Sequence, residues 1–140
     1  MNTVKKSFLM LALCTAGLIG ITSCSKDEPA TKDVRNSYVG SYRTNYEFTV
    51  QGQQYTGTYT LTIVNSATNS NDVILNNIDD SGESVRATVS GNAMTIPQQT
   101  IKQTGISGSG TLNGNVLSFS TQETQTGSVI INISQVATKQ

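Results

Sequence analysis

Hydrophobic and polar residues alternate along most of the chain after residue 40. Tyr42, Tyr46, Phe48 and Val50 share one parity, and the residues of the other parity, such as Arg43, are polar. A period of two is typical of strands that bury one face. The pattern recurs along the chain, separated by short segments rich in Gly, Asn, Asp and Ser. The sequence therefore predicts eight strands, over residues 42–50, 55–63, 72–76, 84–90, 93–97, 106–112, 116–122 and 128–136.

Short connections set the expected topology. Gly91-Asn92 and Asn113-Gly114 are typical two-residue hairpin turns, and only residues 97–105 are expected to form a longer loop. Because short loops join antiparallel neighbours, the simplest arrangement is an up-and-down meander. Closing eight such strands removes exposed sheet edges. We therefore expect an all-β fold, an eight-stranded antiparallel up-and-down barrel.

The apolar parity of each strand predicts the inside of this barrel. An eight-stranded barrel is wide enough either to be filled by its own side chains or to hold one small ligand. Gly57, Gly108 and Gly110 share the inward parity. They leave space for a ligand, or tyrosine rings cover them where the strands coil. The other expected interior residues are Tyr42, Tyr46, Phe48, Tyr55, Tyr59, Leu61, Ile63, Val73, Leu75, Val85, Val89, Met94, Ile96, Ile106, Leu112, Leu117, Phe119, Val129, Ile131 and Ile133.

The first 23 residues have the features of a secretory signal peptide. Lys5 and Lys6 precede a mostly apolar stretch over residues 8–21, which is too short to span a bilayer. The sequence Ile21-Thr22-Ser23-Cys24 resembles the lipobox of bacterial lipoproteins. This resemblance implies that Cys24 is acylated, becomes the first residue of the mature chain and anchors it to a membrane. Two or three acyl chains give a stable anchor.

A drop in charge marks the start of the folded domain. Six of the twelve residues 25–36 are charged, against ten of the 104 residues 37–140. We therefore interpret residues 24–36 as the lipidated cysteine and a charged tether, and residues 37–140 as the barrel domain. Residues 25–28 also resemble an acidic export signal for surface lipoproteins, with a plain solvated spacer as the alternative. The expected location is the outer membrane, on its periplasmic face or on the cell surface.

The composition excludes several classes of function. The chain has no histidine, no tryptophan, nine basic and nine acidic residues. It therefore lacks the usual general base and the commonest metal ligand, and it has no basic excess for nucleic acid. Asp79, Asp80 and Glu83 lack the spacing of a calcium loop and are interpreted as a solvated turn. We expect no catalytic residue, no metal and no cofactor.

Several segments resemble the lipocalin-like (calycin) domains of small Gram-negative lipoproteins. Gly40-Ser41-Tyr42 stands where lipocalins carry Gly-x-Trp, and residues 89–100 and 108–115 resemble the later strands of those domains. The resemblance covers about residues 38–136, but the chain has no tryptophan and no disulfide. It implies a barrel whose ligand mouth is the end with the longer loops.

Two functions from different classes follow. The first is a non-catalytic module that binds a small apolar or amphipathic ligand, or a glycan fragment, at the barrel mouth. The second is a structural or interaction lipoprotein with a filled barrel that docks another envelope protein, and an inhibitory lipoprotein is a variant of it. Candidate ligand contacts are Tyr42, Tyr46, Tyr55, Gly57, Tyr59, Gly108, Gly110 and Phe119. Candidate rim contacts are Gln53, Gln54, Asp79, Asp80, Gln98, Gln99 and Glu123.

Overall fold

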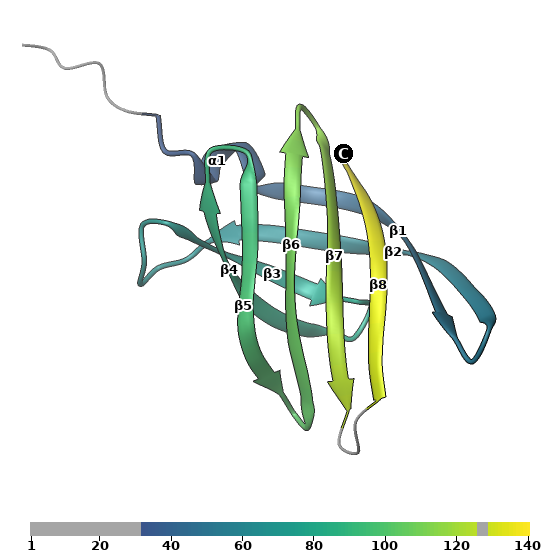
Figure 1. Cartoon of the computed structure of the whole chain (residues 1–140). Coiled ribbons are helices and arrows are strands. Elements are labelled where there is room, and N and C mark those ends of the chain that lie inside the picture. The colour runs from purple at the N-terminus through teal and green to yellow at the C-terminus, as the bar shows by residue number, and fades with distance from the viewer. Residues whose placement is uncertain (1–31, 126–128) are drawn as a thin grey trace, which may run out of the picture. The chain divides into compact units, whose positions relative to one another are not determined.

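The computed structural model describes residues 32–125 and 129–140, and there the chain forms a closed barrel. A short helix, α1 (Arg35–Tyr38), precedes the strands. Each strand is antiparallel to the next, and β1 also pairs with β8 (Figure 1). The predicted eight-stranded up-and-down barrel is confirmed. Its strands are β1 (Gly40–Val50), β2 (Gln53–Asn65), β3 (Asp72–Ile78), β4 (Glu83–Ser90), β5 (Ala93–Ile101), β6 (Thr104–Asn113), β7 (Val116–Gln125) and β8 (Val129–Lys139).

The prediction of a longer loop over residues 97–105 is wrong. Strand β5 continues to Ile101 and β6 begins at Thr104, so only a two-residue turn separates them. The strand accommodates Pro97 because the β5–β6 register shifts between Ile96 and Gln99, and a bulge is where a strand tolerates proline. Pro97 therefore lies at a bulge within the strand, although the sequence predicts that the strand ends there.

One end of the barrel is closed by α1 and filled with side chains. The Tyr42 hydroxyl donates a hydrogen bond to the Tyr38 carbonyl at 2.6 Å, and the Tyr38 hydroxyl donates to the Gly91 carbonyl at 3.2 Å. Both rings are fully buried, and burial raises the pKa of Tyr38 to about 12. The periodicity did not predict α1, because a four-residue helix is barely longer than one helical turn.

The residues just before α1 also contact the barrel. Arg35 donates hydrogen bonds to the carbonyls of Ser66 at 3.1 Å and Asn69 at 3.0 Å, and it pairs with Asp33 at 2.6 Å. Val34 packs against the core. The packed part of the chain therefore reaches Asp33, before the expected start at residue 37. The predicted signal peptide, Cys24 and most of the tether lie outside the described residues. Among the helices that are described, none has the length and apolar character needed to cross a membrane.

Most of the expected interior side chains are buried, but the rings near the β1–β2 turn are not. Tyr46 and Phe48 are half-buried, and Tyr55 is 44% exposed, so its expected place in the core is wrong. The core gains Ile78, Ala87 and Ala137, which the prediction omitted. The alternation thus located the core strand by strand but did not show where each strand leaves the barrel.

The β1–β2 hairpin extends beyond the rest of the barrel. Strand β1 pairs with β8 only from Tyr42 to Phe48, and β2 pairs with β3 only from Thr62 to Asn65. The tip of the hairpin therefore has no neighbouring strand on either side (Figure 1). This divergence explains the exposure of Tyr55, and it opens the barrel at the end opposite to α1.

Candidate functional site

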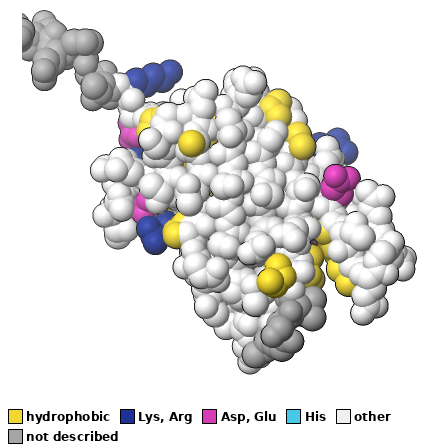
Figure 2. All heavy atoms as spheres, in the orientation of Figure 1, with side chains coloured by type: hydrophobic (Ala, Val, Ile, Leu, Met, Phe, Trp, Pro, Cys, Tyr) yellow, Lys and Arg dark blue, Asp and Glu magenta, His cyan; other side chains and the backbone are white. Residues whose placement is uncertain are grey.

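Two hollows open at the end of the barrel opposite to α1. One, of about 330 Å³, lies between β1 and the β7–β8 end, and its lining includes Tyr46, Phe48 and Ile133. The other, of about 290 Å³, lies between the β3–β4 turn and the β5–β6 turn. Asp79 and Glu123 line both hollows. In Figure 2, hydrophobic side chains are visible in a notch between the β1–β2 hairpin and the rest of the barrel. We call this open end the mouth.

The β3–β4 turn carries Asp79 into the mouth. The β3–β4 register shifts between Asn76 and Ile78, and both Asn77 and Asp79 have positive φ, of 64° and 53°. Asparagine and aspartate tolerate this left-handed conformation better than most residues. The turn is further held by the Asn77 side chain, which accepts a hydrogen bond from the Gly82 amide at 2.8 Å. These local features re-aim the chain after β3 and direct the Asp79 carboxyl group inward.

A buried polar network holds the Asp79 carboxyl group. Gln135 Nε2 donates to Asp79 Oδ1 at 2.5 Å, and the Thr121 hydroxyl lies 3.2 Å from both carboxyl oxygens. Deeper in the barrel, the Tyr59 hydroxyl donates to Gln135 Oε1. Thr121 and Gln135 are 1% and 2% exposed, so their polar atoms depend on these contacts. The inner end of the mouth is therefore hydrogen-bonded, although apolar strands surround it.

The electrostatics of the mouth favour retention of a proton. Burial, together with the neighbouring Glu123, raises the pKa of Asp79 to about 7, although the hydrogen bonds from Gln135 and Thr121 lower it. No described lysine or arginine forms an ion pair with either carboxyl group, and the nearby Lys102 pairs with Glu83 at 2.5 Å. Near neutral pH, this carboxyl pair can hold a proton, accept hydrogen bonds or bind a cation.

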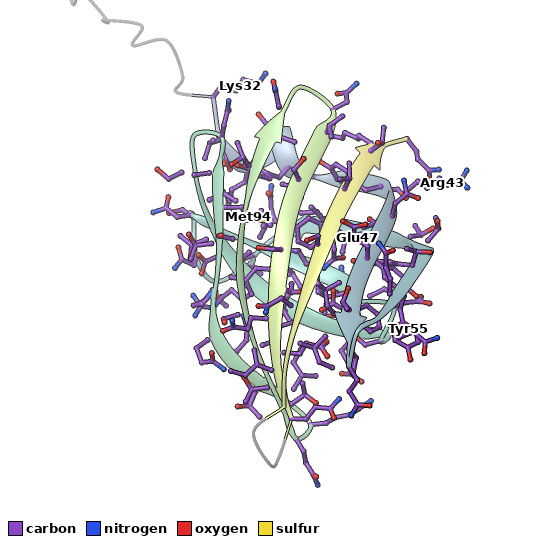
Figure 3. The ribbon with its side chains drawn as sticks, turned by 45° about the vertical axis from the view of Figure 1, so that its right-hand side comes forward. Lys32, Arg43, Glu47, Tyr55 and Met94 are labelled. Carbon is purple, nitrogen blue, oxygen red and sulfur yellow. The ribbon has the colours of Figure 1, made fainter. Side chains whose placement is uncertain are left out.

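A row of aromatic rings connects the network with the hairpin tip. The rings of Tyr59 and Tyr46 lie 6.1 Å apart between centroids, as do those of Tyr46 and Phe48. Phe48 in turn stacks on Tyr55 at 5.1 Å with an angle of 13° between the rings. Tyr55 is labelled on the protruding hairpin in Figure 3. Together the four rings form a surface that runs from buried to exposed, suited to the apolar part of a ligand.

The candidate ligand residues fall in different parts of the barrel. Tyr46 lines the larger hollow, Tyr59 belongs to the polar network and Tyr55 stands at the hairpin tip. Tyr42 is packed at the closed end, and Phe119 is 5% exposed. The mouth therefore brings together the first three of these five residues.

The glycines leave no space inside the barrel. The Tyr46 ring covers Gly57, the alternative that the sequence left open. A side chain at Gly108 would meet the Ser120 carbonyl, and one at Gly110 would meet Phe119 Cβ. The larger hollow instead lies beside the diverging hairpin, and the smaller one lies between the β3–β4 and β5–β6 turns.

The expected rim residues also separate. Asp79 and Glu123 meet in the mouth. Asp80 is exposed beside Asp79, while Gln53 and Gln54 are exposed on the hairpin, where Gln54 Nε2 donates to Glu47 Oε2 at 3.3 Å. Gln98 and Gln99 belong to β5 and not to a loop.

Sequence reasoning missed Thr121 and Gln135, which hold Asp79. Both lie on the inward parity of their strands, two residues beyond Phe119 and Ile133 respectively. That parity was an available signal, because a polar residue at an inward position requires a hydrogen-bond partner. It also places Glu123 inside the barrel, two residues after Thr121.

A third depression lies on the outer surface of the barrel. It is a shallow trough of about 860 Å³ across β5, β6, β7, β8 and β1. Small side chains on the outward parity form most of its floor, and Glu47 of β1 is the charged residue that lines it. Its hydroxyl-bearing residues are Thr95, Ser109, Thr111, Ser118, Ser120 and Ser134.

The described residues contain no group of three or more Cys, Asp or Glu side chains that could hold a metal ion. No protein-family model matches this chain, and no curated protein matches it. Functional interpretation therefore depends on the mouth and the trough.

Proposed function

We propose that this protein is a non-catalytic lipoprotein of the outer membrane that binds a small apolar or amphipathic molecule, or a glycan fragment, at the mouth of a lipocalin-like barrel. The observation that carries this proposal is the meeting of two hollows, of about 290 and 330 Å³, at one half-buried carboxyl pair, Asp79 and Glu123. Ligand sites are concave and mostly apolar, with a few polar groups that fix orientation. The aromatic row and the Asp79 network supply these two elements.

The direction of the chain supports an anchored binder. The described part begins beside α1, at the closed end, whereas the mouth is at the other end. An acylated Cys24, eight residues before Lys32, would attach the closed end to the membrane. The mouth would then face away from the lipid, where a ligand can reach it.

The binding proposal can be tested by ligand capture. Residues 31–140 form one compact unit with a closed barrel, so this unit can be studied on its own. We expect native mass spectrometry of the unit, purified from its own cells, to reveal a bound small molecule. Ile131→Trp, which fills the larger hollow, should abolish the adduct, and Val64→Trp on the outer surface should retain it. An adduct that survives in both variants, or is absent from the parent protein, would contradict binding at the mouth.

The anchor can be tested with the two cysteines of the chain as a matched pair. Cys24→Ser should abolish incorporation of radiolabelled palmitate and transfer the protein from the membrane fraction to the soluble fraction. Cys14→Ser lies in the predicted signal peptide and should change neither result. Equal labelling of both variants would exclude Cys24 as the lipidation site.

The outer trough favours a second candidate, an interaction lipoprotein that docks another envelope protein. Its floor is rich in small hydroxyl side chains, which allow a close approach by a partner, and Glu47 supplies one charge in its lining. A photo-crosslinking residue at Ser120 should then capture a partner in whole cells, and the same residue at Thr62, an exposed position outside the trough, should not. Equal capture at the two sites would count against this candidate.

A further inference from the structure

We infer that the ligand of the mouth is an amphipathic amine, with a protonated amino group set against Asp79 and Glu123 and an apolar body along the aromatic row. This inference rests on the proposed function, because it names the chemical class of the molecule that the mouth would bind. Three features carry it: the apolar side chains of the hollows, the position of the carboxyl pair, and the pairing of the nearby Lys102 with Glu83 and not with this carboxyl pair.

Apolar side chains line both hollows beside the carboxyl pair, and the smaller hollow also carries the polar side chains of Ser81, Glu83, Lys102 and Thr104. Tyr46, Phe48, Ile131 and Ile133 line the larger hollow, and Ile78, Ile101 and Ile106 line the smaller one. The larger hollow continues into the Phe48–Tyr55 stack, which is open to solvent. A ligand with an alkyl or aromatic body can therefore bury it in the hollow while part of it remains exposed. Aromatic faces also attract organic cations.

The carboxyl pair is placed at the inner end of this apolar surface. Gln135 and Thr121 donate to Asp79 from within the barrel and fix its orientation. Glu123, two residues along β7 from Thr121, lines both hollows together with Asp79. A group that enters either hollow therefore reaches both carboxyl groups, in surroundings where burial strengthens charge interactions.

Among the described residues, no cation pairs with the carboxyl pair of the mouth, because Lys102, which lines the smaller hollow, is paired with Glu83. In the described part of the chain, Arg35 pairs with Asp33, Arg86 with Asp72 and Lys102 with Glu83. A second interior group also lacks a partner, because Thr44 Oγ1 is buried without a hydrogen bond and shares a β1–β2 register position with Tyr59. The polar groups of the interior can therefore accept a positive charge and further hydrogen bonds from a ligand. A protonated amine supplies both the positive charge and the donors, whereas a carboxylate would be repelled.

The test compares three probes with the same chain and different heads: octylamine, octanol and octanoate. Each is titrated below its micellar concentration into the 31–140 unit at pH 8, with calorimetry to measure affinity. We expect octylamine to bind at least tenfold more tightly than octanol, and octanoate to bind more weakly than octanol. Asp79→Asn should reduce the preference for the amine to less than threefold and leave octanol binding unchanged. The matched control is Asp80→Asn, whose side chain is exposed, and it should behave like the parent.

The pH dependence gives a second readout. The titratable groups around Asp79 are Glu123 of β7 and Tyr59 of β2, with Asp80 next to it in the turn, and the paired Glu83 and Lys102 line the same smaller hollow. Octylamine is protonated throughout the range from pH 6 to pH 8, while the carboxyl pair loses its proton. Its affinity should therefore rise several-fold over this range in the parent and stay constant in Asp79→Asn. If that variant does not fold, Glu123→Gln removes the second carboxyl group of the pair, and the preference for octylamine over octanol should fall in it while octanol binding stays unchanged.

The possible failures are distinguishable. Equal binding of octylamine and octanol, or tighter binding of octanoate, would overturn the amine inference and leave binding at the mouth intact. Absence of binding by all three probes, together with no retained molecule in native mass spectrometry, would overturn the proposed function itself.

Discussion

At the scale of single residues, the most informative group is Asp79. A carboxyl group in an exposed turn would be ionised at neutral pH, but the turn after β3 carries this one into contact with Gln135 and Thr121. Burial and the neighbouring Glu123 then raise its pKa to about 7. Desolvation of an ionisable group costs folding free energy, and groups with such raised pKa values cluster at sites of binding or chemistry.

The raised pKa of Asp79 predicts a loss of stability at higher pH. The unfolded chain releases this proton near pH 4, whereas the folded chain holds it to about pH 7. Because the folded state binds more protons in this range, the contribution to the free energy of unfolding is full below pH 4 and falls as pH rises to 7. Urea denaturation of the parent at pH 5 and pH 8 should show this loss, and Asp79→Asn should reduce it by about 2 kcal/mol. A parent and variant with identical pH dependence would contradict the burial of Asp79.

At the scale of elements, the barrel is weakly paired between β4 and β5, where one side chain replaces part of the strand pairing. Strands β4 and β5 pair only from Thr88 to Ser90 on β4. Beyond that point Gln99 connects the two strands, because its Oε1 accepts from the Arg86 amide at 3.0 Å and its Nε2 donates to the Arg86 carbonyl at 2.7 Å. The bulge in β5 positions Gln99 for this role.

Removal of this bridge should loosen β4 from β5. We expect Gln99→Ala to lower the free energy of unfolding by about 1–3 kcal/mol, because two backbone groups lose their partner. Hydrogen exchange at the Arg86 amide should become faster in the same variant. The control Gln103→Ala changes an exposed turn residue and should leave both measurements unaltered. Unchanged exchange at Arg86 in Gln99→Ala would show that the bridge contributes nothing.

At the scale of the whole molecule, the barrel combines a closed end with an open one. α1 and the residues before it complete the closed end, whereas the divergence of the β1–β2 hairpin opens the other. The closed end would supply a rigid base for the lipid anchor that we propose. The open end has lower pairing density and is the part suited to adapt to a ligand.

The contacts of Val34 and Arg35 predict that the domain needs residues before the expected boundary. A chain that begins at residue 37 loses the Arg35 hydrogen bonds to Ser66 and Asn69 and the packing of Val34. Its free energy of unfolding should be about 1–3 kcal/mol lower than that of a chain that begins at residue 31, because hydrogen bonds from a charged group are worth this much. Equal stability of the two chains in urea would support the boundary at residue 37.

The alternation of side chains was sufficient to predict the strands and their closure, because burial of one face imposes a period of two on each strand. Turn residues were sufficient for the antiparallel order. The sequence was less informative where a residue type is compatible with two different local structures. Pro97 indicated a loop but lies at a bulge, and Tyr55 follows the inward parity but lies beyond the barrel.

The sequence by itself determined an all-β barrel of eight strands, the faces of those strands and the features that predict a lipid anchor. Each of these depends on residues that are near one another along the chain. Tertiary structure alone decided the site, because Asp79, Thr121 and Gln135 lie far apart in sequence and meet only when the barrel closes. The pKa of Asp79 and the hollows on either side of it follow from that closure and from the divergence of one hairpin.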